Sequence, residues 1–284
     1  MKRTNTDRIF ILGLDGLEYD LVERWNLVHL KQREYGKLEV PIDKERGHPF
    51  TPEVWSSFLL GKQLNVDLEK MRMKYPVVVV FQILKFLRKY INISLGLGLG
   101  DKVLSIIPVK RWKRTKFGIS LDQKTFLDLT KSKAINVPFY NNDAYSFYIM
   151  SRFNLGELSL QQAISAYQKL YRKRKELILS EIEKIQDENV IFAFMHFPDM
   201  MEHFAYKRPW IIKKHYLDLN DFVSFLKNKI GDSTLFLIVS DHGFNLEKGV
   251  HSHYGFYSSS EPLSPKPTRI TDFFHLILQT VKNF

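Results

Sequence analysis

Three short apolar runs, each followed by an aspartate, most constrain how this chain folds. The runs occupy 8–14 (RIFILGL), 190–197 (VIFAFMHF) and 234–240 (TLFLIVS), and the aspartates are Asp15, Asp199 and Asp241. Runs without polar alternation are typical of strands buried on both faces of a parallel sheet. Ligands of such sheets collect beyond the carboxyl ends of the strands. We therefore expect the three aspartates to converge.

Helical patterns separate these runs. A further short run at 134–137 ends at Pro138, and a closing helix is expected over 270–281 with Thr271 as its N-cap. The longest helical pattern spans 159–186, with apolar residues at Ala163, Ala166, Leu170, Leu177 and Ile182. Strands that alternate with helices predict an α/β fold. We expect a three-layer α/β/α sandwich with a mainly parallel central sheet.

Residues 62–120 break this rhythm and carry most of the excess charge. They hold 13 Lys and Arg against 3 Asp and Glu, in a chain whose net charge is +11. They include a basic cluster at 110–116 and a stretch at 77–91 that would form a helix with a broad apolar surface. We interpret 62–120 as an inserted basic cap subdomain, and 1–61 with 121–284 as the core domain.

Three interpretations of the insert stay open. Its cations would attract an anionic substrate, or residues 77–116 would dock on an anionic membrane surface, or the insert is a subdomain with a charged exterior. No nucleic-acid recognition motif accompanies the charge. The sequence does not specify an oligomeric state.

The absence of cysteine excludes disulfides, thiolate zinc sites and cysteine nucleophiles, and it fits a reducing compartment. The polar start of the chain is followed by an apolar run too short for a signal-peptide core. No stretch has the length of an uncharged membrane span. We expect a cytoplasmic protein, with peripheral membrane contact as the alternative.

Three carboxylates in one site repel each other unless a cation compensates them. Histidines lie near two of the aspartates and one loop further on, at His203, His242, His251 and His253. Three aspartates and three of these histidines supply six ligands, enough for two divalent ions. Mixed carboxylate and imidazole ligands favour Zn²⁺, with Mn²⁺ or Fe as alternatives. Two ions ~4 Å apart suit displacement at phosphorus.

Thr51 is the candidate nucleophile for such a reaction. Thr51 followed by Pro52 has the form of a helix N-cap with proline at the first helical position. A hydroxyl there lies beside backbone N–H groups that face a bound phosphate. Metal coordination would lower the pKa of this hydroxyl, so no separate base is needed.

The remaining histidines receive no such role. His196 lies inside an apolar run and has the opposite parity to Asp199, so we expect a core histidine there. His29, His48, His215 and His275 have no partner pattern.

Five motifs in order carry a family resemblance. They are GLDG at 13–16, TPEVWSSFLLGK at 51–62, PDMMEH at 198–203, SDHGF at 240–244 and GVHSHYG at 249–255. Together they resemble the alkaline phosphatase superfamily, and within it the type I phosphodiesterase/nucleotide pyrophosphatase group. INVP at 135–138 is similar to the strand after the cap in microbial members. The resemblance spans most of the chain outside 62–120.

The resemblance implies a role for each site residue. Asp15, Asp241 and His242 would hold one metal, with Thr51 completing that site. The residues implied for the second metal are Asp199, His203 and His251. His251 is preferred to His253 because the last family histidine commonly stands four residues before a glycine, here Gly255. The implied mechanism is attack by the Thr51 alkoxide on phosphorus and hydrolysis of the phosphothreonine by water activated at the second metal.

The resemblance favours a hydrolase of phosphodiester or pyrophosphate bonds acting on an anionic phosphate ester. Residues 60–67 lack the proline, histidine and second glycine that follow the nucleophile helix in many members. Two alternatives therefore stay open. One is a phosphomonoesterase or phosphomutase of the same superfamily. The other is a non-catalytic, membrane-associated binding protein with a vestigial site.

Overall fold

The computed structural model describes residues 8–64, 123–143 and 145–282. The predicted cap at 62–120 lies outside the described residues apart from 62–64, and so do the expected helix over 77–91 and the membrane-docking surface at 77–116. The division into a core domain and a cap therefore stays a prediction.

The central sheet has six strands in the order β2-β8-β5-β1-β4-β3. Their bounds are Arg8–Leu14 (β1), Glu34–Glu39 (β2), Ser132–Ile135 (β3), Val190–Met195 (β4), Thr234–Ser240 (β5) and Tyr254–Ser259 (β8). β8 pairs antiparallel with both of its neighbours, and the remaining pairs are parallel. A small ribbon of β6 (Phe244–Asn245) and β7 (Val250–His251) lies outside this sheet. The expectation of a mainly parallel sheet is confirmed.

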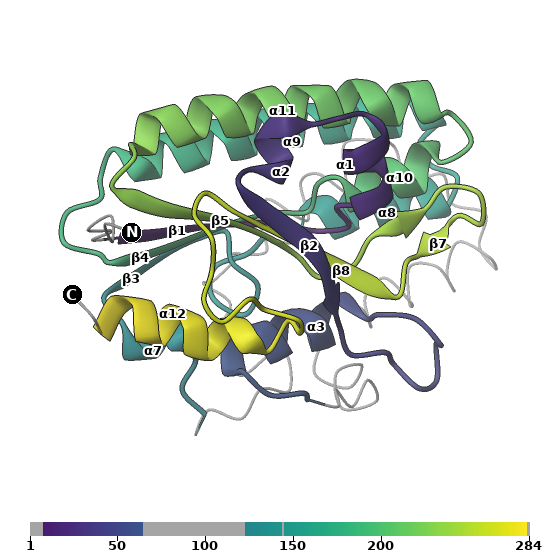
Figure 1. Ribbon diagram of the computed structural model, residues 1–284. Coiled ribbons are helices and arrows are strands. Elements are labelled where there is room, and N and C mark those ends of the chain that lie inside the picture. Colours follow the sequence, from purple (N-terminus) through teal and green to yellow (C-terminus); the bar gives the residue numbers. More distant parts are fainter. Residues whose placement is uncertain (1–7, 65–122, 144, 283–284) are drawn as a thin grey trace.

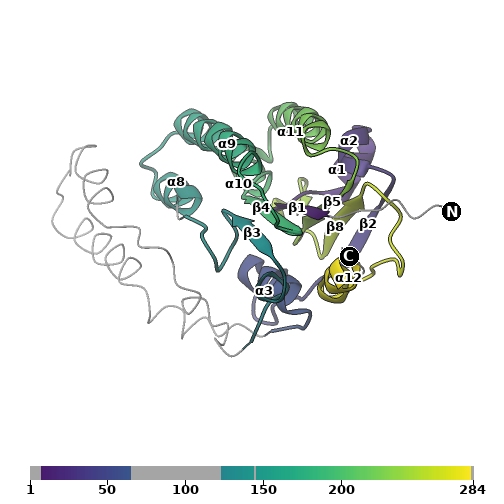
Figure 2. The same cartoon turned by 90° about the vertical axis from the view of Figure 1, so that its left-hand side faces the viewer.

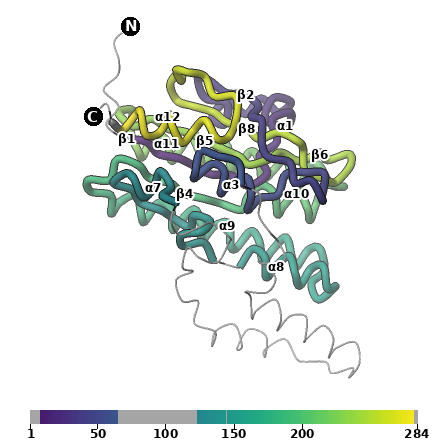
Figure 3. Tube along the Cα trace, turned by 90° about the horizontal axis from the view of Figure 1, so that it is seen from below, coloured from purple at the N-terminus to yellow at the C-terminus, as the bar shows by residue number. Residues whose placement is uncertain are grey.

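Helices cover both faces of the sheet, which gives three layers (Figures 1 and 2). One face carries α1 (Tyr19–Arg24), α2 (Val28–Lys31), α8 (Tyr145–Asn154), α9 (Leu160–Ile182), α10 (Asp199–Ala205) and α11 (Pro209–Ile230). The other face carries α3 (Thr51–Leu60), α7 (Phe126–Leu129) and α12 (Asp272–Lys282), which are nearest the viewer in Figure 3. None of the described helices has the length and apolarity to cross a membrane.

Side chains of the central strands alternate between two hydrophobic clusters. Phe10 and Leu12 of β1 pack with residues of α9 and α11, such as Tyr216. Ile9 and Ile11 pack on the opposite face with residues of α3 and α12. Both faces of these strands are buried away from water, which explains why the runs are almost entirely apolar.

Two of the predicted strands, 8–14 and 234–240, have the expected bounds. The strand expected at 190–197 ends at Met195, and the one expected at 134–137 lies two residues earlier. Asn136 has a φ of 57°, a left-handed conformation that ends β3. The long helix ends four residues before the predicted 186, and the closing helix starts at Asp272, directly after Thr271. Neither β2 nor β8 is predicted from the sequence.

Candidate metal centre

The site lies where three neighbouring parallel strands end. β5, β1 and β4 are adjacent and run the same way, so their carboxyl ends meet at one edge of the sheet. Asp15 directly follows β1, Asp241 directly follows β5, and Asp199 begins α10 after β4. The backbone N–H of Asp199 donates to the carbonyl of Asp15 at 2.9 Å, which ties two of these ends together.

The first candidate metal-binding group consists of Asp15, Asp241 and His242, whose potential ligand atoms lie within 4.8 Å of one another. His242 Nε2 lies 3.3 Å from Asp15 Oδ1 and 3.5 Å from Asp241 Oδ2. The other ring nitrogen of His242 contacts the carbonyl of Gly243 at 3.1 Å. This contact fixes the ring so that Nε2 faces the carboxylates.

The second group surrounds Asp199. Asp199 Oδ1 lies 3.2 Å from His203 Nε2 and 3.4 Å from His251 Nε2, and these two nitrogens are 3.0 Å apart. Asp199 and His251 also form a potential metal-binding group with His242, so the two groups adjoin. His251 therefore joins the cluster, whereas His253 is exposed.

The described residues in both groups fit divalent ions. Ligands about 2.0–2.1 Å from a tetrahedral ion lie about 3.3 Å from one another, and the measured separations are 3.0–3.5 Å. The carboxylate oxygens that face the imidazoles of His203, His242 and His251 are Asp15 Oδ1, Asp199 Oδ1 and Asp241 Oδ2. Each is buried and has no hydrogen-bond partner among the described residues. Such oxygens are costly unless a cation compensates them.

Burial and mutual repulsion shape the protonation of the carboxylates. Burial and the negative charge of Asp15 raise the pKa of Asp241 well above its ordinary value. Burial opposes ionisation of Asp199 as well, but the positive charge of His203 holds the pKa of Asp199 well below its ordinary value. The hydrogen bond from His196 and the positive charge of His242 likewise outweigh burial at Asp15 and lower its pKa.

The imidazoles respond to the same charges. Burial disfavours the charged ring of His242, but Asp241 and the other carboxylates outweigh it and raise the pKa of His242 well above its ordinary value. Burial and the charge of His242 lower the pKa of His251. The cluster therefore favours positive charge at its centre, carried by a proton on His242 or by a metal ion.

Thr51 lies at the start of α3 and faces the first group. Its Oγ1 is 3.2 Å from His242 Nε2. The expectation that Thr51 is the N-cap is wrong, because the N-cap is Phe50 and Thr51 is the first helical residue. The Phe50 carbonyl accepts the first helical hydrogen bonds, from Glu53 at 2.8 Å and Val54 at 3.1 Å. The Thr51 hydroxyl faces the cluster instead of capping the helix.

His196 corrects a second expectation. It is buried, as expected of a core histidine, but its Nδ1 lies 2.9 Å from Asp15 Oδ2. Its Nε2 contacts Asn142 Nδ2 at 3.0 Å. No sequence pattern signals either contact, because Asn142 and Asp15 are far from His196 along the chain.

A buried hydrogen-bond network around Glu18 and Glu202 lies next to the second group. The sequence did not predict this network. Tyr216 Oη donates to Glu202 Oε1 at 2.6 Å and accepts from the N–H of Glu18 at 3.0 Å. Glu18 in turn accepts from Ser252 Oγ and Tyr254 Oη, each at 2.6 Å. Burial raises the pKa of Glu202 well above its ordinary value. These contacts join α10, α11 and the loop that follows His251.

No family model matches the chain, and no curated protein matches it. Among solved structures, it is similar to mouse ectonucleotide pyrophosphatase/phosphodiesterase 5, with 12% identity and a TM-score of 0.44 over 83% of this chain. The match covers 57% of the mouse chain, so this chain spans little more than half its length. It is also similar to alkaline phosphatase from the Antarctic bacterium TAB5, with 13% identity and a TM-score of 0.43 over 98% of both chains.

Proposed function

We propose that this chain is a metal-dependent phosphoryl-transfer hydrolase that cleaves phosphodiester or pyrophosphate bonds. The observation that carries the proposal is the meeting of three aspartates and three histidines beside one hydroxyl, with His203 joined to the cluster by its contacts to Asp199 and His251. Three buried carboxylate oxygens there lack hydrogen-bond partners among the described residues. The groups come from several elements that are distant in sequence. Such convergence at the carboxyl ends of parallel strands is typical of an active site.

The proposed ligands divide as the two groups do. Asp15, Asp241 and His242 would hold one ion, with Thr51 completing its coordination. The proposed ligands of the other ion are Asp199, His203 and His251. Mixed nitrogen and oxygen ligands favour Zn²⁺, with Mn²⁺ or Fe as alternatives. Two bound ions would stabilise negative charge on the attacking and leaving oxygens.

Thr51 would act as the nucleophile. Its Oγ1 would lose its proton to solvent and form a bond to phosphorus while the bond from phosphorus to the leaving oxygen breaks. Water would then hydrolyse the phosphothreonine and restore the hydroxyl. The position of Thr51 in the first turn of α3 supports this role, because the positive end of the helix dipole favours a bound phosphate.

A comparison of two chromogenic substrates tests the reaction class. Turnover of bis-p-nitrophenyl phosphate and p-nitrophenyl phosphate is measured with Zn²⁺ and with Mn²⁺. We expect the diester to be preferred by more than about a hundredfold, which corresponds to ~2.7 kcal/mol of barrier. The reverse preference would identify a monoesterase, and transfer to an added alcohol would identify a phosphomutase. Absence of turnover and of bound metal would identify a vestigial site.

Substitution of Thr51 tests the nucleophile. We expect Thr51→Ala to abolish turnover, and Thr51→Ser to retain part of it because a hydroxyl remains. Thr271→Ala is a matched control, since Thr271 directly precedes α12 and belongs to neither metal-binding group. Mass spectrometry of acid-quenched reactions would detect a phosphorylated Thr51 peptide. Full hydrolysis by the Thr51→Ala protein would contradict the assignment.

A further inference from the structure

We infer that His196 and Asn142 are positioning residues that orient the Asp15 carboxylate toward its metal. The inference rests on the proposed function, because it concerns a ligand of the first group. It assigns a role in metal binding to two residues that lie outside both candidate metal-binding groups.

The hydrogen bonds run in one direction from Asn142 to Asp15. The amide nitrogen of Asn142 is a donor, so His196 Nε2, 3.0 Å away, accepts from it. The ring proton of this tautomer is then on Nδ1, which donates to Asp15 Oδ2 at 2.9 Å. One oxygen of Asp15 is thereby held, and the oxygen without a hydrogen-bond partner, Oδ1, faces His242 at 3.3 Å. Partners of this kind fix the orientation of metal-binding side chains.

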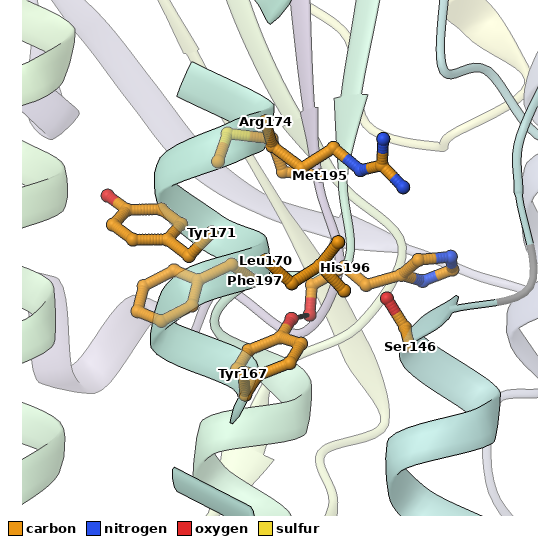
Figure 4. Close-up of a pocket in the computed structure, with 8 residues that line it drawn as sticks. All are labelled: Ser146, Tyr167, Leu170, Tyr171, Arg174, Met195, His196 and Phe197. Atoms are coloured by element: carbon orange, nitrogen blue, oxygen red, sulfur yellow. Dashed lines mark hydrogen bonds between the residues drawn. The ribbon is translucent and has the colours of Figure 1, made fainter. Parts of the chain in front are cut away.

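Two phenyl rings pack against the imidazole of His196. Edge-to-face contacts place the rings of Phe194 and Phe147 at 4.7 and 5.2 Å from it, measured between ring centroids. The hydroxyl of Tyr167 donates to the carbonyl of His196 (Figure 4). The ring of His196 is 7% exposed, so bulk water has little access to its hydrogen bonds.

The loop that carries Asn142 is itself anchored to α9. The neighbouring Asp143 forms a partly buried ion pair with Arg174 of α9. Figure 4 shows Arg174 and Ser146 on the same side of a small cavity as the His196 ring. The cavity has a volume of about 10 Å³, close to that needed by one water molecule. Through this ion pair, the packed helix α9 supports the loop from which the hydrogen bonds run from Asn142 through His196 to Asp15.

Metal titration of the full chain tests the inference. Binding of Zn²⁺ is followed by calorimetry and by elemental analysis in the wild type, His196→Leu and Asn142→Leu. Removal of such a partner typically weakens metal affinity about 10–100-fold, and we expect a loss of this size in one of two sites. His196→Asn keeps an amide donor near the position of Nδ1 and should restore most of the affinity.

His215→Leu is a matched control. His215 is also 7% exposed, and its Nε2 contacts Gln168 Nε2 at 3.2 Å. It lies on α11 and contacts neither Asp15 nor Asn142 through a hydrogen bond among the described residues. We expect it to lose stability to a similar extent and to keep wild-type metal affinity. Urea unfolding identifies any variant that fails to fold. If His196→Leu does not fold, Asn142→Leu decides the question.

Two results would overturn the inference. Wild-type Zn²⁺ affinity in both His196→Leu and Asn142→Leu would show that the hydrogen bonds do not act on the metal. An equal loss of affinity in His215→Leu would show a general effect of core damage. Failure of the proposed function is recognised separately. A wild type that binds Zn²⁺ but hydrolyses no phosphate ester leaves the titration decisive. A wild type that binds none of Zn²⁺, Mn²⁺ and Fe²⁺ refutes both proposals.

Discussion

A single imidazole, that of His242, contacts most of the functional side chains of the site. Its Nε2 lies close to Thr51, Asp15 and Asp241, and its ring stacks on that of His251 with centroids 3.8 Å apart. The side chain is fully buried. Any change of its charge is therefore felt by both metal-binding groups, without screening by solvent.

The stability of the metal-free protein should fall as the pH rises, because of His242. Its pKa is raised well above 6.5 in the folded protein, so the folded state binds this proton more tightly than the unfolded chain does. The resulting stabilisation is complete below pH 6.5 and is lost as the pH rises through the raised pKa. The loss is about 1.4 kcal/mol for each pKa unit of the shift. The raised pKa of Asp241 contributes with the same sign.

Urea unfolding of the chelator-treated protein between about pH 6 and about pH 9 measures this slope. His242→Gln should flatten it. Saturating Zn²⁺ should remove or reverse it, because metal binding replaces the proton. A metal-free protein whose stability increases with pH in this range would contradict the prediction.

At the level of residues, the sequence predicted the functional side chains that directly follow strands. It did not predict those whose partners are distant along the chain. Asp15 and Asp241 were found because each directly follows an apolar run. His196 was interpreted as a core histidine because its partners, Asp15 and Asn142, come from other parts of the chain. Only the fold shows that such partners meet.

At the level of elements, full burial made the central strands predictable. β1 and β5 have the expected bounds because both faces of these strands are dry. β2 and β8 were missed because their sequences, EYGKLE and YGFYSS, mix polar and glycine residues without clear alternation. They pair through their backbones at the edge of the sheet, with Gly36 opposite Tyr257. Hydrogen bonds of the backbone leave little trace in the side-chain pattern.

The turn between β1 and α1 requires glycine at residue 16. Gly16 has a φ of 81°, and a Cβ atom there would lie 2.6 Å from the Cβ of Asp199 and 2.8 Å from its Cα. We expect Gly16→Ala to displace Asp199, and thus to weaken metal binding at the second group as well as stability. Gly156→Ala is the matched control, because Gly156 has a φ of 71° but a Cβ atom there would meet no atom within 4 Å.

Both substitutions should cost about 1–2 kcal/mol for the left-handed backbone. Gly16→Ala alone should lose further stability and Zn²⁺ content, measured by urea unfolding and elemental analysis. Equal losses of stability in the two variants, with two Zn²⁺ retained in each, would show that Asp199 accommodates the methyl group.

At the level of the whole molecule, the site brings together residues from elements that are distant in the sequence. The ligands of the two groups follow β1, β4 and β5 or lie in β7, and Thr51 begins a helix on the opposite face of the sheet from α10. Three buried carboxylates at one edge oppose folding unless positive charge compensates them. Metal binding and folding should therefore be coupled.

Removal of metal should lower the melting temperature of the full chain. An ion present at a hundred times its Kd stabilises the folded state by about 2.7 kcal/mol, which for a chain of this size corresponds to roughly 4–5 °C per ion. Asp241→Asn provides a sharper comparison, because it removes a carboxylate whose ionisation burial and the charge of Asp15 strongly disfavour. We expect this variant to melt below the wild type in saturating Zn²⁺ and at or above it in chelator, measured by calorimetry. Melting of the wild type at the same temperature in Zn²⁺ and in chelator would show that the cluster of acids and imidazoles is stable without a metal.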